Sequence, residues 1–309
     1  MALEGLHHIT AITGRATRNI DFYARTLGLR LVKKTVNFDQ PTAYHLYYGD
    51  ERGTPGSLLT FFEFPGAAPG RHGDGTPYRV VWRVAGDAAL NFWSARLDDM
   101  GVPVTRTAGS LRFDDPDGLE HELVADEAPD APLRADAGDV PAEHALLGLA
   151  GVRAYAADAR PSAPLLDVLG FARGDEEGSW ELAGDERRAR WSYDASHADA
   201  VQGAGSIHHV AWSAADDAEL ERFRAIVTEA GARPTPIIDR QYFHSVYFRE
   251  PSGILFELAT RDIGFAVDEP LESLGEELKL PPQHEPARAR LETLLTPIAS
   301  PRSGAAGRS

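Results

Sequence analysis

Short stretches of alternating apolar and polar residues recur along this chain, and such stretches are typical of half-buried β-strands. Two clear examples are YHLYYGD, which begins at Tyr44, and GILFELA, which begins at Gly253. Other stretches place apolar residues at i, i+3 and i+4 and stop at a glycine, which predicts amphipathic helices. These are NIDFYARTLG, ALNFWSARLDDMG and ELERFRAIVTEAG. Because the two patterns are interleaved, the sequence predicts an α+β fold.

One order of elements occurs twice and aligns without a gap. The stretches that begin at Tyr78 and His208 both read as strand, short acidic turn, amphipathic helix, glycine and strand. Each copy ends in a Pro-X-Gly turn followed by an alternating strand, with a glutamate four residues after the glycine. These glutamates are Glu122 and Glu257. The chain therefore contains an internal repeat, which determines how the rest is interpreted.

Two weaker copies of the repeat begin at Leu6 and Leu149. We therefore expect four βαβββ units that form two open barrel-like sheets, at about 5–64, 78–125, 147–196 and 205–260. By sequence position the chain divides into a first pair of units, a second pair and a C-terminal extension, at 1–137, 145–264 and 265–309. The last ten or so residues, SPRSGAAGRS, have the composition of a disordered tail.

Two of the four units begin with a His-His doublet. Successive side chains of a strand point to opposite faces, so a doublet directs one ring to each face. In the fourth unit, His209 lies on the face with small and polar neighbours, where it can line a cleft. His8 takes the same place in the first unit, on one face with Thr10. Glu257 has apolar sequence neighbours, and burying it alone would cost several kcal/mol without a partner or a cation.

Two imidazoles and one carboxylate on neighbouring strands form a facial triad. This ligand set leaves coordination positions open and favours Fe(II) over Zn(II) where a substrate and O₂ must be held together. A hydrogen-bonded core histidine is the alternative for His8 taken singly. The other two units have Arg79 and Gly151 at the histidine position, so we expect Glu122 to have no metal site.

Composition narrows the possible functions. The chain has no cysteine, which excludes disulfides, thiolate metal sites and a thiol nucleophile. Its formal net charge of −16 disfavours nucleic acid and anionic lipid as partners. No apolar run approaches the roughly 20 residues of a membrane span, and the N-terminus lacks the features of a secretory signal. We therefore expect a cytoplasmic protein with a small-molecule ligand and no membrane or nucleic-acid partner.

The four units, with LHHIT at the start and IHHVAW and GILFELA in the fourth, resemble the vicinal oxygen chelate superfamily (glyoxalase, bleomycin resistance and extradiol dioxygenase proteins). Within it the chain is similar to the hydroquinone-type ring-cleaving dioxygenases, through long phrases such as YHLYYGDERGTPGSLLTFFEFP and DRQYFHSVYFREPSGILFELAT. The catechol-cleaving branch takes its first ligand from the third unit. Here that strand reads LAGVRAY and contains no histidine.

The resemblance implies an Fe(II) enzyme, with Mn(II) as the alternative metal, that opens a small aromatic substrate with O₂ and that could be a homo-oligomer. The implied metal ligands are His8, His209 and Glu257. The implied donors to oxygen species at the metal are Tyr247, Arg240, Thr10 and His208. Because the ligands come from the first and fourth units, those two units are expected to share one barrel and the second and third the other.

Other interpretations stay open at this point. A glyoxalase-type isomerase would need a fourth protein ligand, and Glu63 takes that position if the strand register allows it. A metal-free protein that binds an aromatic drug would use the same concave sheets. Tyr247 could be plain core, Arg240 could pair with Asp239, Thr10 could only fill space, and His7 and His208 should point away from their neighbours and serve packing. We also expect the segment 264–282 to cover the mouth of the cleft.

Overall fold

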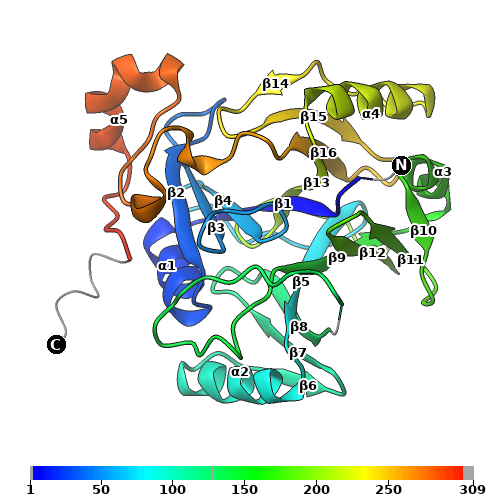
Figure 1. The fold of residues 1–309 in the computed structure, drawn as a ribbon, viewed down its shortest axis with the longest axis horizontal. Helices are drawn as coiled ribbons and strands as arrows, with labels where there is room; N and C mark the ends of the chain where they lie inside the picture. The colour runs from blue at the N-terminus through cyan, green and yellow to red at the C-terminus, as the bar shows by residue number, and fades with distance from the viewer. Residues whose placement is uncertain (1–2, 127, 302–309) are drawn as a thin grey trace.

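The computed structural model describes residues 3–126 and 128–301. Those residues form two eight-stranded mixed sheets with helices packed on their outer faces (Figure 1). This is the α+β architecture of open barrel-like sheets that the sequence predicts. Most of the disordered tail expected from the sequence, residues 302–309, lies outside the described residues.

The first sheet has the strand order β14-β15-β16-β13-β1-β4-β3-β2. Its strands are β1 (Leu6–Thr13), β2 (Arg30–Val36), β3 (Tyr44–Gly49), β4 (Leu58–Glu63), β13 (Ile207–Ala214), β14 (Ile238–Asp239), β15 (His244–Arg249) and β16 (Leu255–Thr260). The second sheet has the order β10-β11-β12-β9-β5-β8-β7-β6. Its strands are β5 (Thr76–Val84), β6 (Thr105–Thr107), β7 (Ser110–Asp114), β8 (Glu120–Ala125), β9 (Leu149–Ala156), β10 (Phe171–Arg173), β11 (Ser179–Ala183) and β12 (Arg188–Ala195).

Each sheet joins two units that are not partners by sequence position. The first and fourth units meet where β1 pairs antiparallel with β13, and the second and third meet where β5 pairs antiparallel with β9. The prediction that the ligand-bearing units share one barrel is therefore confirmed. The division of the chain near residues 137 and 145 stays a prediction. Strands on either side of it pair with each other in both sheets.

Helices cover the outer face of each sheet (Figure 1). They are α1 (Ala16–Ile20), α2 (Asp87–Asp99), α3 (Ala163–Val168), α4 (Asp217–Glu229) and α5 (Arg288–Leu294). Helix α1 continues directly into a π-helical turn, Asp21–Thr26, which widens the helix and places Tyr23 in the core. Four short 3₁₀ turns complete the set: Arg160–Ser162, Phe265–Val267, Leu271–Ser273 and Pro282–Ala287.

Alternation along the strands separates the hydrophobic core from the cleft. On β13, Val210 and Trp212 pack in the main core, whereas Ala211 belongs to a small cluster on the opposite face. On β16, Phe256 and Leu258 face the main core in the same way. The face that carries the odd-numbered residues of both strands is thus the concave face. This sorting is the one predicted for His209 and for Glu257.

The C-terminal extension lies along β2, at the edge of the first sheet. Lys34 and Leu278 form an isolated parallel bridge, and the amide of Lys279 donates to the carbonyl of Lys34 at 3.0 Å. Gly275 has a φ of +78°, and a Cβ built there would lie 1.9 Å from the carbonyl oxygen of Leu31. Only glycine therefore allows the extension to approach the strand so closely.

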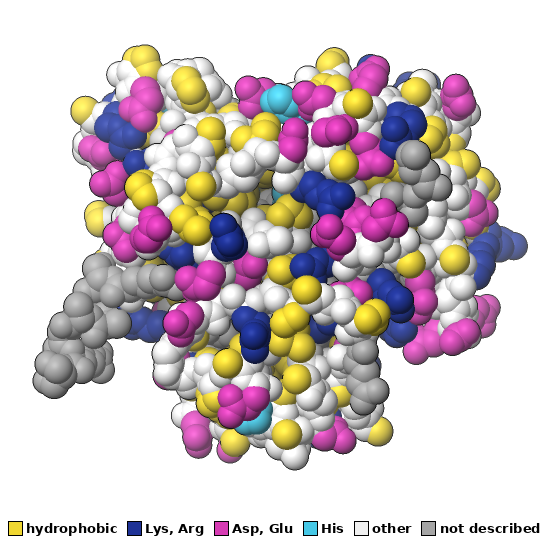
Figure 2. Space-filling model, viewed as in Figure 1, with side chains coloured by type: hydrophobic (Ala, Val, Ile, Leu, Met, Phe, Trp, Pro, Cys, Tyr) yellow, Lys and Arg dark blue, Asp and Glu magenta, His cyan; other side chains and the backbone are white. Residues whose placement is uncertain are grey.

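Long apolar helices are absent from the described residues: none could cross a membrane. On the face of the molecule shown in Figure 2, acidic and basic side chains are interspersed.

Candidate metal centre

Three donor atoms converge on the concave face of the first sheet. The Nε2 atoms of His8 on β1 and His209 on β13 are 3.2 Å apart. One carboxylate oxygen of Glu257, Oε2, lies 3.2 Å from His8 Nε2 and 2.9 Å from His209 Nε2. All three side chains are buried. Strand pairing causes this convergence, because Ala211, two residues after His209, is the register partner of Glu257.

The spacing of the three atoms suits a metal ion. Donor atoms about 2.1 Å from one ion are about 3 Å apart when they subtend a right angle, as they do on one face of an octahedron. Both carboxylate oxygens of Glu257 are buried and receive no hydrogen bond from a described residue. A carboxylate buried without donors is costly unless a cation compensates it. The residues present therefore fit a divalent metal held by His8, His209 and Glu257.

The neighbouring histidine fixes the tautomer of His8. The carbonyl oxygen of Thr260 can only accept, so His7 donates to it through Nε2, at 3.0 Å. The other nitrogen of His7, Nδ1, then accepts from His8 Nδ1 at 2.9 Å. His8 is left with a lone pair on Nε2, the atom that faces His209 and Glu257. The expectation that His7 points away from His8 is thus wrong: the pairing of β1 with β13 shifts register between Leu6 and His8, which interrupts the alternation, and the two rings meet edge to face.

The second doublet repeats the contact, with His208 Nδ1 2.7 Å from His209 Nδ1. If His209 offers the lone pair of Nε2 to a metal, its Nδ1–H donates to His208, whose own proton then lies on Nε2. His208 lines the cleft, so this N–H is a donor at the site. Burial first, and then the charge of His209, lower the pKa of His208 to about 3. His208 was likewise expected to point away from its neighbour, and the structure corrects that.

The electrostatics of the site keep the ligands in their binding forms. Burial by itself raises the pKa of Glu257, but His8 and His209 beside it hold this pKa well below its ordinary value. Burial lowers the pKa of His209, although Glu257 opposes that shift. An ionised carboxylate and a neutral imidazole are the forms that bind a metal.

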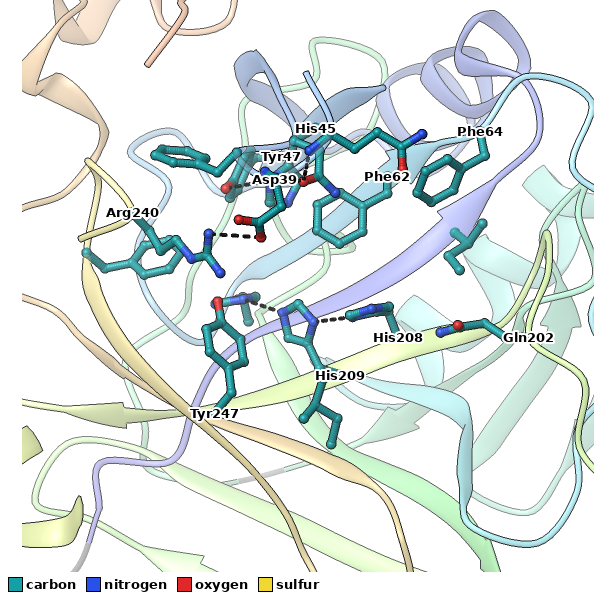
Figure 3. A pocket seen from close by; sticks show the side chains of 17 residues that line it. Asp39, His45, Tyr47, Phe62, Phe64, Gln202, His208, His209, Arg240 and Tyr247 are labelled. Atoms are coloured by element: carbon teal, nitrogen blue, oxygen red, sulfur yellow. Dashed lines mark hydrogen bonds and ion pairs between the residues drawn. The ribbon is translucent and has the colours of Figure 1, made fainter. Parts of the chain in front are cut away.

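His8 and His209 line a cavity of about 470 Å³, and Glu257 lies buried against them. This volume is within the usual range for small-molecule sites of roughly 300–1,000 Å³. His208, His209 and Tyr247 lie along one side of it, and His45, Tyr47, Phe62 and Asp39 lie along the other (Figure 3). Aromatic rings make up much of the lining. The cavity is thus suited to a flat aromatic molecule with polar groups at its two ends.

Tyr247 and Arg240, both predicted from the resemblance, line this cavity. The guanidinium of Arg240 lies 5.2 Å from the centre of the Tyr247 ring, and its Nη1 is 3.3 Å from the carboxylate of Asp39. The partner of Arg240 is therefore Asp39 and not Asp239, which was the alternative. Burial, and then the charge of Glu257, raise the pKa of Tyr247, so its hydroxyl stays protonated. Thr10 is fully buried, does not line the cavity and hydrogen-bonds Thr60 at 2.8 Å.

The second sheet has no metal site among its described residues. Glu122 lies opposite Val81, which comes two residues after Arg79, and Glu257 lies opposite Ala211, which comes two residues after His209. The guanidinium groups of Arg79 and Arg112 each approach the carboxylate of Glu122 to 3.2 Å. Burial by itself raises the pKa of Glu122, but a hydrogen bond from Ser110 and these two arginines lower it. Arginine thus supplies the positive charge that the other sheet leaves to a metal, in agreement with the absence of histidines.

Glu63 does not reach the candidate metal centre. The register pairs Thr10 with Thr60, so Thr60 and not Glu63 takes the place in the first unit that Glu257 takes in the fourth. Glu63 lies three residues later and accepts the amide of Ala16 at 2.7 Å. The alternative with Glu63 as a fourth ligand therefore does not hold, because it depended on a register that sequence alone does not fix.

The segment 264–282 supplies no lining residue of the cavity. Phe265 and Leu274 of this segment instead pack in the small cluster with Ala211, and its acidic side chains hold strand β2. Lys33 on β2 is fully buried, and its ammonium lies 2.7 Å from both Asp268 and Glu269. The segment thus lies along β2 and does not cover the mouth of the cavity as expected. The loop after β2 lines the mouth in its place, through Asn37, Phe38, Asp39 and Gln40.

His45 and Tyr47 are not selected as site residues from the sequence. The structure gives both residues polar contacts at the cavity. A signal was present, since the alternation in YHLYYG places these two side chains on one face of β3. The loop 37–40 and Gln202 had no sequence pattern that could have marked them.

With this geometry in place, comparison with known proteins gives the family. A model of the Glyoxalase/Bleomycin resistance protein/Dioxygenase superfamily matches residues 5–123 and 165–258. The chain belongs to this superfamily.

Three relatives place the chain within the Glyoxalase/Bleomycin resistance protein/Dioxygenase superfamily. It is 41% identical over 302 residues to the "Putative ring-cleaving dioxygenase MhqO" of Bacillus subtilis, covering 95% of this chain and 96% of the relative. It is 33% identical over 326 residues to the "Chlorohydroquinone/hydroquinone 1,2-dioxygenase" of Sphingobium indicum, covering 96% and 97%. A crystal structure of a "putative dioxygenase" from Bacillus subtilis superposes with a TM-score of 0.90 at 40% identity, covering 97% and 98%.

Proposed function

We propose that this chain is an Fe(II)-dependent ring-cleaving dioxygenase that acts on hydroquinone-type aromatics with O₂. One observation carries the proposal: His8 and His209, which line the cavity, converge on Glu257, whose buried carboxylate receives no hydrogen bond from the described residues. The relatives named for ring-cleaving and hydroquinone dioxygenase activity support the reaction class. Mn(II) is the alternative metal, because it accepts the same ligand set.

The bound metal would supply open positions for a substrate hydroxyl and O₂ and would allow electrons to pass between them. The chain supplies the surroundings. Phe62 and Phe64 bound the cavity and exclude water from the ring. His208 Nε2–H and the protonated hydroxyl of Tyr247 are donors to oxygen atoms that gain negative charge. The charge of Arg240, held by Asp39, favours the same atoms. Ring opening places both atoms of O₂ in the product, so no other oxidant or reductant is needed.

Thr10 was proposed for the same role as these donors, but its position assigns it to the hydrogen bond with Thr60. An isomerase of the glyoxalase type is disfavoured because Glu63 contacts the backbone of α1. We further propose that the protein works in the cytoplasm on a small aromatic substrate, without a membrane or nucleic-acid partner. Assembly into a homo-oligomer is part of the same proposal.

Reconstitution under anaerobic conditions tests the function. The wild-type protein is loaded with Fe(II), its metal content is measured by mass spectrometry, and O₂ uptake is followed after addition of methylhydroquinone or chlorohydroquinone. We expect uptake with a ring-opened product from the wild type and none from His209→Ala. Glu257→Gln should weaken metal binding more than about 100-fold, since a lost ligand costs at least as much as a lost supporting contact.

Glu122→Gln is the matched control, because it makes the same change at the equivalent position of the second sheet. It should keep both iron and O₂ uptake. Absence of uptake with hydroquinones and catechols, despite one iron per chain, would refute the dioxygenase proposal.

A further inference from the structure

A chain of four neutral hydrogen-bonding groups runs from the cavity into the first sheet. The hydroxyl of Tyr47 lies 2.9 Å from His45 Nδ1, and His45 Nε2 lies 2.9 Å from the hydroxyl of Thr60. The Thr60 hydroxyl in turn contacts that of Thr10 at 2.8 Å. Of the four, Tyr47 and His45 line the cavity. The proposed function gives this row of hydrogen-bonded side chains no role.

The hydrogen-bonded row can present either a donor or an acceptor to the cavity. Burial lowers the pKa of His45 well below, and raises that of Tyr47 well above, their ordinary values, so both groups stay neutral. If Tyr47 donates to His45, its oxygen accepts from the cavity; if His45 donates to Tyr47, the hydroxyl of Tyr47 donates to the cavity. A neutral group of this kind selects a neutral polar partner such as a phenolic hydroxyl. Arg240, in contrast, carries a charge and selects anionic oxygen.

Tyr47 and His45 lie where one end of a para-substituted ring would reach. Tyr47 and His45 lie on the wall opposite His208, His209 and Tyr247 (Figure 3). A flat ring with one hydroxyl at the metal centre would extend across the cavity towards that wall. The second hydroxyl of a 1,4-diol points away from the first and reaches across. That of a 1,2-diol stays beside the metal-bound oxygen.

We propose that Tyr47, positioned by His45, binds the substrate hydroxyl that lies para to the metal-bound hydroxyl. This inference rests on the proposed function and names the residues that select hydroquinones over catechols at that site. The Tyr47 hydroxyl contacts substrate, whereas His45 is a positioning residue that orients the Tyr47 hydroxyl. Phe62 packs against His45, with ring centroids 4.4 Å apart, and so fixes the imidazole in place.

Equilibrium binding without oxygen tests the proposal independently of turnover. Fe(II)-loaded wild type, Tyr47→Phe and Tyr48→Phe are titrated anaerobically with hydroquinone, phenol and catechol by isothermal calorimetry. The wild type should bind hydroquinone about tenfold more tightly than phenol, as one net hydrogen bond allows. Tyr47→Phe should bind the two alike and should bind catechol as the wild type does.

Tyr48→Phe is the matched control, because Tyr48 is the next residue of β3 and its hydroxyl bonds Asn19 on the other face. It loses an equally buried hydroxyl and should keep the preference for hydroquinone. His45→Asn provides a second variant, in which Tyr47 keeps its hydroxyl but loses its fixed partner, and the preference should fall two- to fivefold.

Three results would overturn the proposal: a wild type that does not prefer hydroquinone to phenol, a Tyr47→Phe variant that weakens all three ligands equally, or a loss of preference in Tyr48→Phe as well. Failure of the dioxygenase function has a different signature. Hydroquinone would then bind with the predicted preference, and no O₂ would be consumed when air is admitted.

Discussion

At the scale of single residues, each histidine ligand is oriented by the histidine before it. His7 donates through Nε2 to the carbonyl of Thr260 and accepts at Nδ1 from His8, which sets the tautomer of the ligand. Contacts of this kind hold a ligating imidazole in its metal-binding orientation and raise its basicity. The His-His doublet is therefore a unit, in which one ring binds and the other positions.

We predict that His7→Leu weakens metal binding about 10- to 100-fold, because His8 loses the acceptor for its Nδ1–H. His7→Asn should restore part of the affinity, since its amide oxygen can accept the same proton. The measurement is a competition titration of Fe(II) or Co(II) against a chelator. His144→Leu is a suitable control, because His144 stacks on Phe92 beside the second sheet. Equal affinities for wild type and His7→Leu would contradict the prediction.

At the scale of elements, the repeated Pro-X-Gly turn anchors one unit to the unit before it. In the second unit, Asp115 accepts the hydroxyl of Tyr23 from the first unit at 2.9 Å. In the fourth unit, Glu250 accepts the hydroxyl of Tyr193 from the third at 3.0 Å. Both carboxylates also accept backbone amides of their own turns. The repeat thus reproduces a connection between units as well as the units themselves.

Asp115 makes this connection sensitive to pH. Burial raises the pKa of Asp115 to about 6 although Leu119 and Tyr23 donate to it. The folded pKa lies above the unfolded value of about 3.9, so between these two pH values Asp115 is ionised in the unfolded chain and protonated in the folded one. Ionisation then stabilises the unfolded state, and the free energy of unfolding falls as pH rises. The wild type should therefore lose up to about 3 kcal/mol from this group as pH rises from 4 to 6, at 1.36 kcal/mol per pKa unit.

We predict that Asp115→Asn lacks this loss. The stability of the variant relative to that of the wild type should therefore increase from pH 4 to pH 7. Any fixed cost of the substitution displaces the variant's curve without changing its slope. The measurement is the thermal unfolding midpoint of both proteins across that range. Parallel curves would show that Asp115 ionises normally in the folded protein.

At the scale of the whole molecule, the metal centre joins the two ends of the repeat array. The ligands come from β1 and from β13 and β16, which become neighbours only when the first and fourth units share a sheet. The C-terminal extension then fastens the outer strand of that sheet through Lys33. The extension is therefore expected to affect stability more than the chemistry of the site.

We predict that Glu269→Gln destabilises the fold by about 3 kcal/mol, because it removes one partner of the buried Lys33 ammonium. Metal affinity should stay within about twofold of wild type, since the extension does not line the cavity. The measurements are denaturant unfolding and metal titration. Glu272→Gln is the matched control and should change stability by less than about 0.5 kcal/mol. Loss of metal binding in Glu269→Gln would place the extension in the site after all.

The sequence alone determined the repeated unit, the faces of its strands except at His7 and His208, and the identity of the three candidate ligands. Side-chain alternation and internal repetition are local properties, so they survive without a structure. The arginine at position 79 also revealed that the equivalent place in the second sheet has no metal ligand.

Only the tertiary structure decided how strands pair and what long loops contact. A strand's register depends on its neighbour, and a shift moved Thr60 into the position that Glu63 had been given. Arg240 pairs with Asp39 rather than Asp239, and the extension lies along β2 rather than over the cavity, because both contacts join segments far apart in sequence. The Tyr47–His45 pair was visible as one face of a strand, but its place opposite the metal ligands came from the closing of the sheet.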